Sequence, residues 1–343
     1  MAQFQNTLYV TTQGAFLSKD HETVVVRVDR EPRLTVPLHH LGGIVCFGRV
    51  AMSPELMAAC AGSGIGISFL TENGRFLARV EGEASGNVLL RREQYRAADD
   101  RDRCCRLARS FVVGKVANAR AVVMRAAREA TTDQGRGALE GAVARLADAG
   151  SALLGSATIG AVRGHEGDAA ATYFRAFDHL IRKQKEAFRF DRRTRRPPRD
   201  PVNAMLSFLY AVLLHDCASA LQATGLDPAV GFLHVDRPGR PGLALDLMEE
   251  LRPILADRLA VGLINLEQLR SEDFVTRETG AIEMTEDARK TVLVAYQKRK
   301  QEEIKHPFVD ERMTWARVPH VQARLLARTI RGDLDDYPPF LWK

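Results

Sequence analysis

The hydrophobic pattern of the chain changes near residue 87, and this change limits the possible folds more than any other feature. Before it, short apolar runs are broken by turn residues, which is typical of β-strands; the runs lie at 7–11, 23–28, 43–47 and 66–70. After it, apolar residues recur at the three- and four-residue spacing of an amphipathic helix, beginning with Leu107, Phe111, Val112, Val116, Ala119 and Val123. The sequence therefore predicts an α+β protein, in which a β-rich N-terminal domain (a short sheet or sandwich with one helix) precedes a larger all-α C-terminal domain.

Local signals predict several individual elements. Ser53 precedes a helical pattern that ends near Gly62, so one helix is expected between strands. The pair Asn73-Gly74 stands between two apolar runs and predicts a β-hairpin. Further helical patterns occupy 138–149, 167–185, 202–222, 244–260 and 285–305. We expect domains at 1–90 and 101–343, joined by a linker at 91–100.

Composition narrows the class of protein. At 343 residues the chain has room for about two domains, and its formal charge of +6 suits a polyanionic partner if the basic residues cluster. The five cysteines include no Cys-x-x-Cys pair, which favours reduced thiols over a disulfide framework or a zinc site. The N-terminus lacks a secretory pattern and no run of about 18 apolar residues occurs, so we expect a prokaryotic cytoplasmic protein that does not span a membrane.

A basic segment at 189–201 is interrupted by prolines, which prevent a continuous helix. It is expected to be a mobile or extended loop. Its arginines are candidate contacts for a DNA backbone, and the candidates are Arg192, Arg193, Arg195 and Arg196. A solvated charged loop without a ligand is the alternative.

Four side chains have the chemistry of a divalent-metal site: Glu166, His234, Asp246 and Glu249. One imidazole with carboxylates suits Mn²⁺ or Mg²⁺ better than a structural Zn²⁺, which favours several Cys or His ligands. Asp246 and Glu249 are three residues apart on a predicted helix and so share a face. Glu166 is expected on another helix that begins near His165. Spacing alone leaves ordinary readings open, namely a surface histidine, solvent-facing acids and a first-turn helix acid.

The motifs around these residues resemble a known family, the CRISPR-associated integrases (Cas-one). The resemblance is carried by Arg163-Gly-His-Glu-Gly-Asp-Ala-Ala, Asp200-Pro-Val-Asn-Ala-Met, Gly231-Phe-Leu-His and Leu243-Ala-Leu-Asp-Leu-Met-Glu-Glu-Leu-Arg-Pro. It extends over nearly the whole chain, since 43–48 and 64–70 match near the N-terminus and His306-Pro matches near the C-terminus. Four ordered motifs in one chain are far more specific than any one of them.

The resemblance implies a homodimer, with the N-terminal domain in dimerisation, and assembly with DNA and the small CRISPR partner Cas-two. It implies Glu166, His234 and Asp246 as catalytic metal ligands, with Glu249 as a supporting acidic ligand, and Arg237 as a phosphate contact. The expected reaction is transesterification, in which the 3′-OH of a protospacer DNA end attacks a phosphodiester of the CRISPR repeat with the help of Mn²⁺ or Mg²⁺. Water in place of the 3′-OH would give endonuclease activity.

Two alternatives belong to other functional classes. A non-catalytic, basic DNA-binding scaffold would have an acidic cluster with a purely structural role. A metal phosphoesterase would act on small molecules and would not bind duplex or branched DNA. No Gly-x-x-x-x-Gly-Lys-Ser/Thr loop is present, so the motif that commonly binds nucleoside triphosphates is missing.

Overall fold

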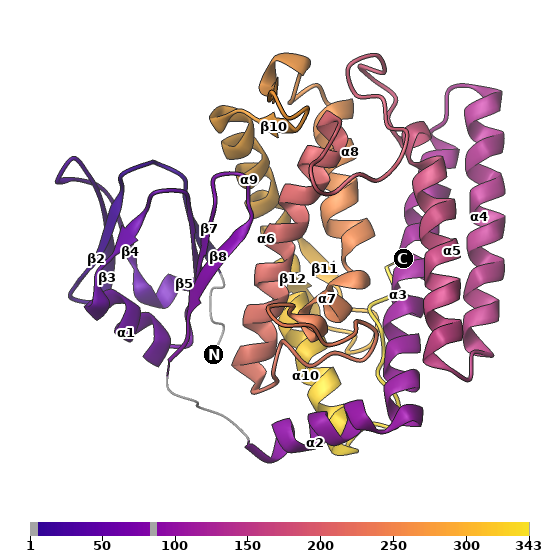
Figure 1. Ribbon diagram of the computed structural model, residues 1–343, viewed down its shortest axis with the longest axis horizontal. Coiled ribbons are helices and arrows are strands. Elements are labelled where there is room, and N and C mark those ends of the chain that lie inside the picture. The colour runs from indigo at the N-terminus through magenta and orange to yellow at the C-terminus, as the bar shows by residue number, and fades with distance from the viewer. Residues whose placement is uncertain (1–5, 83–87, 343) are drawn as a thin grey trace. The chain divides into compact units, whose positions relative to one another are not determined.

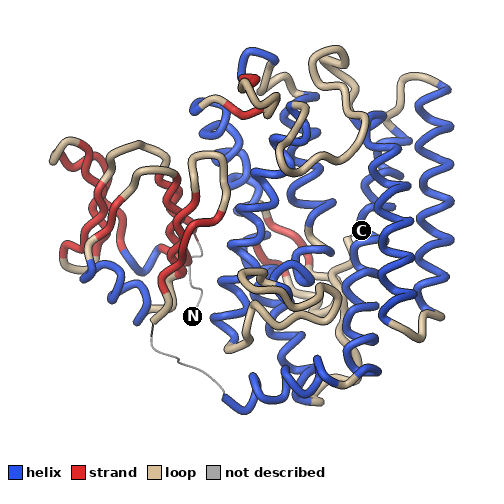
Figure 2. The backbone as a smooth tube through the Cα atoms, in the orientation of Figure 1, coloured by secondary structure: helices blue, strands red, loops and turns tan. Residues whose placement is uncertain are grey.

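Strands dominate up to residue 82 and helices from residue 88 onwards, as the hydrophobic pattern predicts (Figures 1 and 2). The computed structural model describes residues 6–82 and 88–342. The chain separates into two compact units, the first made of residues 1–86 with Leu293–Gln301 and the second of Asn87–Val292 with Glu302–Lys343. The expected α+β class is confirmed, whereas the expected domain limits differ because a late segment, Leu293–Gln301, joins the first unit.

Two four-stranded sheets form most of the first unit. One contains, in spatial order, β1 (Asn6–Val10), β5 (Leu41–Phe47), β7 (Gly66–Leu70) and β8 (Phe76–Val80); the first three are parallel and β8 is antiparallel to β7. The other contains β4 (Glu31–Pro37), β3 (Thr23–Val28), β2 (Phe16–Asp20) and β6 (Ala51–Met52). The β7–β8 connection confirms the predicted hairpin, and Gly74 in it has a φ of 85°, a left-handed conformation that glycine adopts readily.

The core of the first unit is apolar and draws on both sheets and on helix α1 (Pro54–Gly62). Leu17, Ile44 and Leu56 are fully buried there. Burial of such side chains contributes roughly 1.5–3 kcal/mol each. The predicted cap of α1 is confirmed, because the Ser53 hydroxyl accepts a hydrogen bond from the Leu56 amide.

Three long helices of the second unit pack against one another: α3 (Arg101–Arg128), α4 (Asp133–Leu154) and α5 (Ile159–Ala176) (Figure 1). They are preceded by α2 (Val88–Asp99), which occupies nearly all of the range expected to be a linker. That linker prediction was therefore wrong. The residues of α2 form an amphipathic helix that buries Leu90, Gln94 and Ala97.

Helix α6 (Pro201–Thr224) is the apolar centre of the second unit and contacts α7 (Gly242–Glu249) and α10 (Val318–Arg331). Asp200 caps its start, Pro201 occupies its first turn, and Gly225 ends it at a φ of 87°. By length and composition α6 could cross a membrane, yet 61% of its most apolar window is buried within the protein. The sequence of α6 is thus that of a core helix.

Most of the remaining described elements are short, and several correct the predicted helices. The pattern at 244–260 is divided into α7, a π-helical turn (Arg252–Asp257) and α8 (Arg258–Asn265). The pattern at 285–305 yields α9 (Glu286–Gln301) and then β11 (Glu303–Lys305), which pairs with β12 (Arg312–Thr314). A second ribbon pairs β9 (Phe274–Thr276) with β10 (Ile282–Met284). Short 3₁₀ turns occupy Leu38–His40, Phe177–Leu180, Ser271–Asp273 and Trp315–Arg317.

Candidate active site

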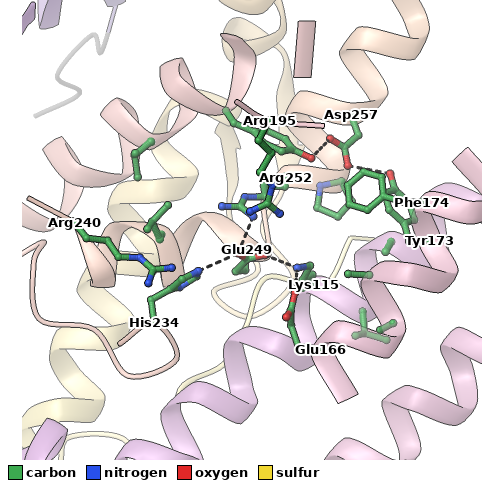
Figure 3. Close-up of a pocket in the computed structure, with 18 of the residues that line it drawn as sticks. Lys115, Glu166, Tyr173, Phe174, Arg195, His234, Arg240, Glu249, Arg252 and Asp257 are labelled. Carbon is green, nitrogen blue, oxygen red and sulfur yellow. Dashed lines mark hydrogen bonds and ion pairs between the residues drawn. The ribbon is translucent and has the colours of Figure 1, made fainter. Parts of the chain in front are cut away.

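A cavity of about 820 Å³ in the second unit brings together residues that are far apart in the sequence. Its walls come from helices α3 to α7, the π-helical turn, and the loops that precede α6 and α7. The charged side chains on these walls are Lys115, Glu166, Arg195, Arg196, His234, Arg237, Arg240, Glu249, Arg252 and Asp257. Figure 3 labels all of them except Arg196 and Arg237. Six of these ten carry a fixed positive charge, so the cavity suits an anionic ligand even though carboxylates also line it.

Glu249 is the centre of the charged network. Its Oε1 lies 2.8 Å from Arg252 Nη1 and 3.8 Å from His234 Nε2, and its Oε2 lies 2.8 Å from Lys115 Nζ (Figure 3). Burial acts to raise the pKa of Glu249, but the charges of Arg252, Lys115 and His234 outweigh it and lower the pKa to about 2. Glu249 is therefore an ionised carboxylate on the cavity wall at neutral pH. Its Oε2 receives no well-aligned hydrogen bond despite the nearby ammonium group.

Asp246 lies outside the cavity lining, which argues against its expected role as a direct ligand. Its side chain is fully buried and absent from the cavity lining. Its Oδ2 accepts hydrogen bonds from the amides of Phe232 and Leu233 (2.6 and 2.9 Å), and its Oδ1 accepts one from the His234 amide (3.0 Å) and lies 2.6 Å from His234 Nδ1. Both carboxylate oxygens of Asp246 are thus used to hold the loop and the His234 imidazole in place.

Close backbone packing makes this arrangement possible. A Cβ atom on Gly231 would lie 2.7 Å from the Gly242 carbonyl carbon and 2.9 Å from Asp246 Oδ2. Only glycine fits there without displacing backbone, which explains the Gly231-Phe-Leu-His motif in physical terms. The Arg163 guanidinium adds a further anchor by donating to the Leu233 carbonyl at 2.8 Å. Because Nδ1 of His234 faces Asp246, Nε2 is the nitrogen that faces Glu249.

Glu166 lies on the same cavity but in a different setting. It is in the middle of α5, which begins at Ile159, so the expectation of a helix start near His165 was wrong. Its carboxylate pairs with the Lys115 ammonium group, and Lys115 also pairs with Glu249. Lys115 therefore connects the two carboxylates, with a side chain that is only 14% exposed.

Asp257 forms a second buried acidic centre on the cavity wall. Its carboxylate accepts hydrogen bonds from the hydroxyls of Tyr210 (2.7 Å) and Tyr173 (3.0 Å) (Figure 3). Burial raises its pKa to about 6, although these hydrogen bonds and the nearby charges of Arg193 and Arg252 oppose the rise. The Arg252 guanidinium lies over the Tyr210 ring, 4.9 Å from its centroid. The cluster thereby fixes the guanidinium that pairs with Glu249.

The predicted basic loop divides into two kinds of arginine. Arg195 and Arg196 are exposed and line the cavity, and Arg192 is exposed outside it. Arg193 is half-buried, and its guanidinium donates to Asn203 Oδ1 at 2.5 Å and to Ser207 Oγ at 3.1 Å. These bonds hold Nη1 and Nη2 inside the protein and so argue against its expected role as a DNA contact. Arg237 lines the cavity, as a phosphate contact requires.

The side chains on the cavity fit a divalent ion in type. The two carboxylates of Glu166 and Glu249 and the Nε2 of His234 form a mixed oxygen and nitrogen donor set that suits Mn²⁺ or Mg²⁺. Within residues 6–82 and 88–342, however, no group of three or more His, Cys, Asp or Glu side chains is arranged to hold a metal ion. The Lys115 ammonium stands between the carboxylates and already supplies a positive charge there. The donor set fits an ion if Lys115 turns aside.

Sequence reasoning missed four residues of the cavity: Lys115, Arg240, Arg252 and Asp257. Arg252 had a local signal, because it follows Glu249 by three residues. Asp257 had another, since it ends the apolar run Pro253-Ile-Leu-Ala. Lys115 is an ordinary member of an amphipathic helix, 51 residues from Glu166. Nothing in its sequence neighbourhood points to the site.

The chain is similar to known proteins in both sequence and fold. The family model described as CRISPR associated protein Cas1 matches residues 8–298. A relative from Chlorobaculum tepidum, named CRISPR-associated endonuclease Cas1 1, is 52% identical over 350 residues, covering 100% of each chain. A casposase bound to integration product has a TM-score of 0.84 and 22% identity, covering 99% of this chain and 95% of that one. A Cas6-RT-Cas1–Cas2 complex has a TM-score of 0.83 and 22% identity, covering 100% of this chain and 36% of that one. Both of these solved structures have the same fold as this chain.

Proposed function

Because the chain belongs to the Cas1 family, we propose that it is a metal-dependent DNA endonuclease and integrase that inserts new spacers into a CRISPR array. One observation carries the proposal: in a member of this family, the imidazole of His234 and the carboxylates of Glu166 and Glu249 line one basic cavity. Its proposed substrates are protospacer DNA and the CRISPR repeat. Its proposed assembly is a homodimer that binds the small partner Cas-two, in the cytoplasm of a prokaryote.

The proposed ligands of Mn²⁺ or Mg²⁺ are Glu166, His234 and Glu249. A bound ion would polarise the scissile phosphodiester and lower the pKa of the attacking hydroxyl. Asp246 is assigned a different role from the one its sequence suggests, since it holds the imidazole so that Nε2 faces the cavity. Arg252 keeps Glu249 ionised and fixed on the opposite side.

The reaction exchanges one phosphodiester for another. The 3′-oxygen of the protospacer end bonds to phosphorus in the repeat, and the bond from that phosphorus to the neighbouring 3′-oxygen of the repeat breaks. The attacking hydroxyl loses its proton and the departing 3′-oxygen gains one, so no nucleoside triphosphate is consumed. Arg195, Arg196 and Arg237 border the cavity and would neutralise the phosphate charges that gather there.

Reconstituted integration tests this proposal. The chain, Cas-two, a labelled duplex with free 3′-OH ends and a repeat-bearing plasmid are combined with and without Mn²⁺. We expect Glu166→Gln and His234→Ala to abolish strand joining while DNA binding and the thermal unfolding transition are retained. Glu286→Gln, on an exposed ion pair with Lys290, is the matched control and should join strands normally.

Two outcomes would favour other functions. Full integration by Glu166→Gln and His234→Ala would support the DNA-binding scaffold, since catalysis would then not depend on these groups. Phosphatase activity on a small nucleotide, without binding of duplex or branched DNA, would support the small-molecule phosphoesterase.

A further inference from the structure

We propose that Lys115 and a divalent metal ion compete for the same two carboxylates, so that metal binding displaces the Lys115 side chain from Glu166 and Glu249. The inference rests on the proposed function, because it assigns these carboxylates to the metal. It makes Lys115 an internal cation of the site, which holds the two acids together and sets how tightly the site binds metal.

The position of Lys115 carries the first step. It extends from α3 to Glu166 on α5 and to Glu249 on α7, so one ammonium group joins acids from two other helices. Nζ lies 2.8 Å from Glu249 Oε2. A metal ion held by the two carboxylates would occupy the space beside their oxygens that the Lys115 ammonium group fills. A metal ion and the Lys115 ammonium group on the same oxygens would repel each other.

Arg252, the other cation that pairs with Glu249, is held in place more firmly than Lys115. Arg252 pairs with Oε1, the opposite oxygen from that of Lys115, and stacks on the Tyr210 ring. It also follows Glu249 by three residues in the same chain segment, so it is fixed from two sides. Lys115 has a flexible four-carbon stem and lines a cavity of about 820 Å³ into which it can turn. Lys115 is therefore the cation that an incoming metal displaces.

Three measurable consequences follow for Lys115→Met, which removes the charge and keeps the apolar stem. Mn²⁺ should bind about tenfold more tightly, since the ion no longer has to break a partly buried ion pair. With EDTA present, the variant should melt at a lower temperature than the wild type, because Glu166 and Glu249 lose their shared partner. Saturating Mn²⁺ should raise the melting temperature of the variant more than that of the wild type.

Free Mn²⁺, measured by electron paramagnetic resonance, gives the affinity without any DNA reaction. Lys115→Gln is titrated beside Lys115→Met, so that a folding defect in one variant leaves the other to decide. Lys115→Arg keeps the charge and should bind Mn²⁺ no more tightly than the wild type. Arg195→Met removes a different cation of the cavity and measures the through-space effect of one charge; it should change the affinity by less than threefold.

The outcomes separate this inference from the proposed function. If Lys115→Met and Lys115→Gln bind Mn²⁺ no more tightly than Arg195→Met, while Glu249→Gln has lost the metal, displacement is wrong and the metal site stands. If Glu249→Gln and Glu166→Gln bind Mn²⁺ as the wild type does, the metal site itself is wrong and the inference falls with it.

Discussion

The most informative test compares Asp246→Asn with Glu249→Gln, two isosteric changes three residues apart on α7. Asp246 is fully buried with four groups directed at its oxygens, whereas Glu249 lines the cavity. We expect Asp246→Asn to damage the fold strongly and metal binding partially. We expect Glu249→Gln to eliminate metal binding.

The magnitude for Asp246→Asn follows from its hydrogen bonds. Two backbone amides donate to Oδ2, and the His234 amide and Nδ1 face Oδ1. An Asn side chain can place its amino group on either side, and on either side it faces at least one backbone N–H. At least one hydrogen bond to a charged group becomes a donor–donor contact and the others weaken, at about 1.5–3 kcal/mol for each bond lost. The expected cost is about 3–5 kcal/mol of the free energy of unfolding.

The effect on metal binding differs in kind. With Asp246→Asn, the imidazole of His234 loses its orienting carboxylate, and such losses weaken metal binding about 10–100-fold. Glu249→Gln removes a negatively charged ligand and leaves Arg252 and Lys115 without their shared anion, so no binding is expected at millimolar Mn²⁺. Urea unfolding gives the stabilities, and Mn²⁺ titration by electron paramagnetic resonance gives the affinities.

Two results would refute this reasoning. A loss of stability below about 0.5 kcal/mol for Asp246→Asn would mean that its hydrogen bonds do not hold the loop. Abolished Mn²⁺ binding in Asp246→Asn together with retained binding in Glu249→Gln would restore Asp246 as the ligand and assign the supporting role to Glu249.

Three further predictions concern side chains of the second unit. The pKa of Asp257, raised to about 6 from an ordinary 3.8, means that the folded protein keeps a proton that the unfolded chain releases. The contribution of Asp257 to stability is therefore greatest below pH 4 and falls by about 3 kcal/mol as the pH rises through 6 to 7. Urea unfolding of Asp257→Asn should lack this contribution. Arg193→Ala should lower the free energy of unfolding by about 2 kcal/mol and leave the salt dependence of DNA binding unchanged. Arg195→Ala should reduce the slope of that salt dependence by about one without a loss of stability. If the two variants behave alike in urea denaturation and DNA titrations, the distinction between a structural and a DNA-binding arginine is wrong. Asn118→Ala removes buried hydrogen bonds of 2.7 Å to the carbonyls of Glu250 and Phe340 and should lower the free energy of unfolding by about 2 kcal/mol, and an unchanged urea midpoint would count against it.

Local chemistry accounts for the parts of the fold that were predicted. The Ser53 cap and the Asn73-Gly74 turn act within a few residues, so the sequence alone is sufficient to identify them. The single helix predicted at 244–260 was wrong because its structure depends on contacts with other helices. Its periodicity is helical throughout, but packing of Asp257 against two tyrosine hydroxyls from other helices accompanies a π-helical turn that local propensity does not specify.

The candidate site also separates what the sequence determines from what the tertiary structure decides. Residue types and ordered motifs, read from the sequence by itself, determined the family, the α+β class and the acids and imidazole that gather at one cavity. Spacing placed Asp246 and Glu249 on one helical face, but it did not decide which of them faces the cavity. That choice was made by the tertiary structure, through the loop amides that surround Asp246 and through Lys115 and Arg252, which hold Glu249 at the wall. Hydrogen bonds and ion pairs between distant segments depend on three-dimensional proximity, which no local pattern of residues encodes.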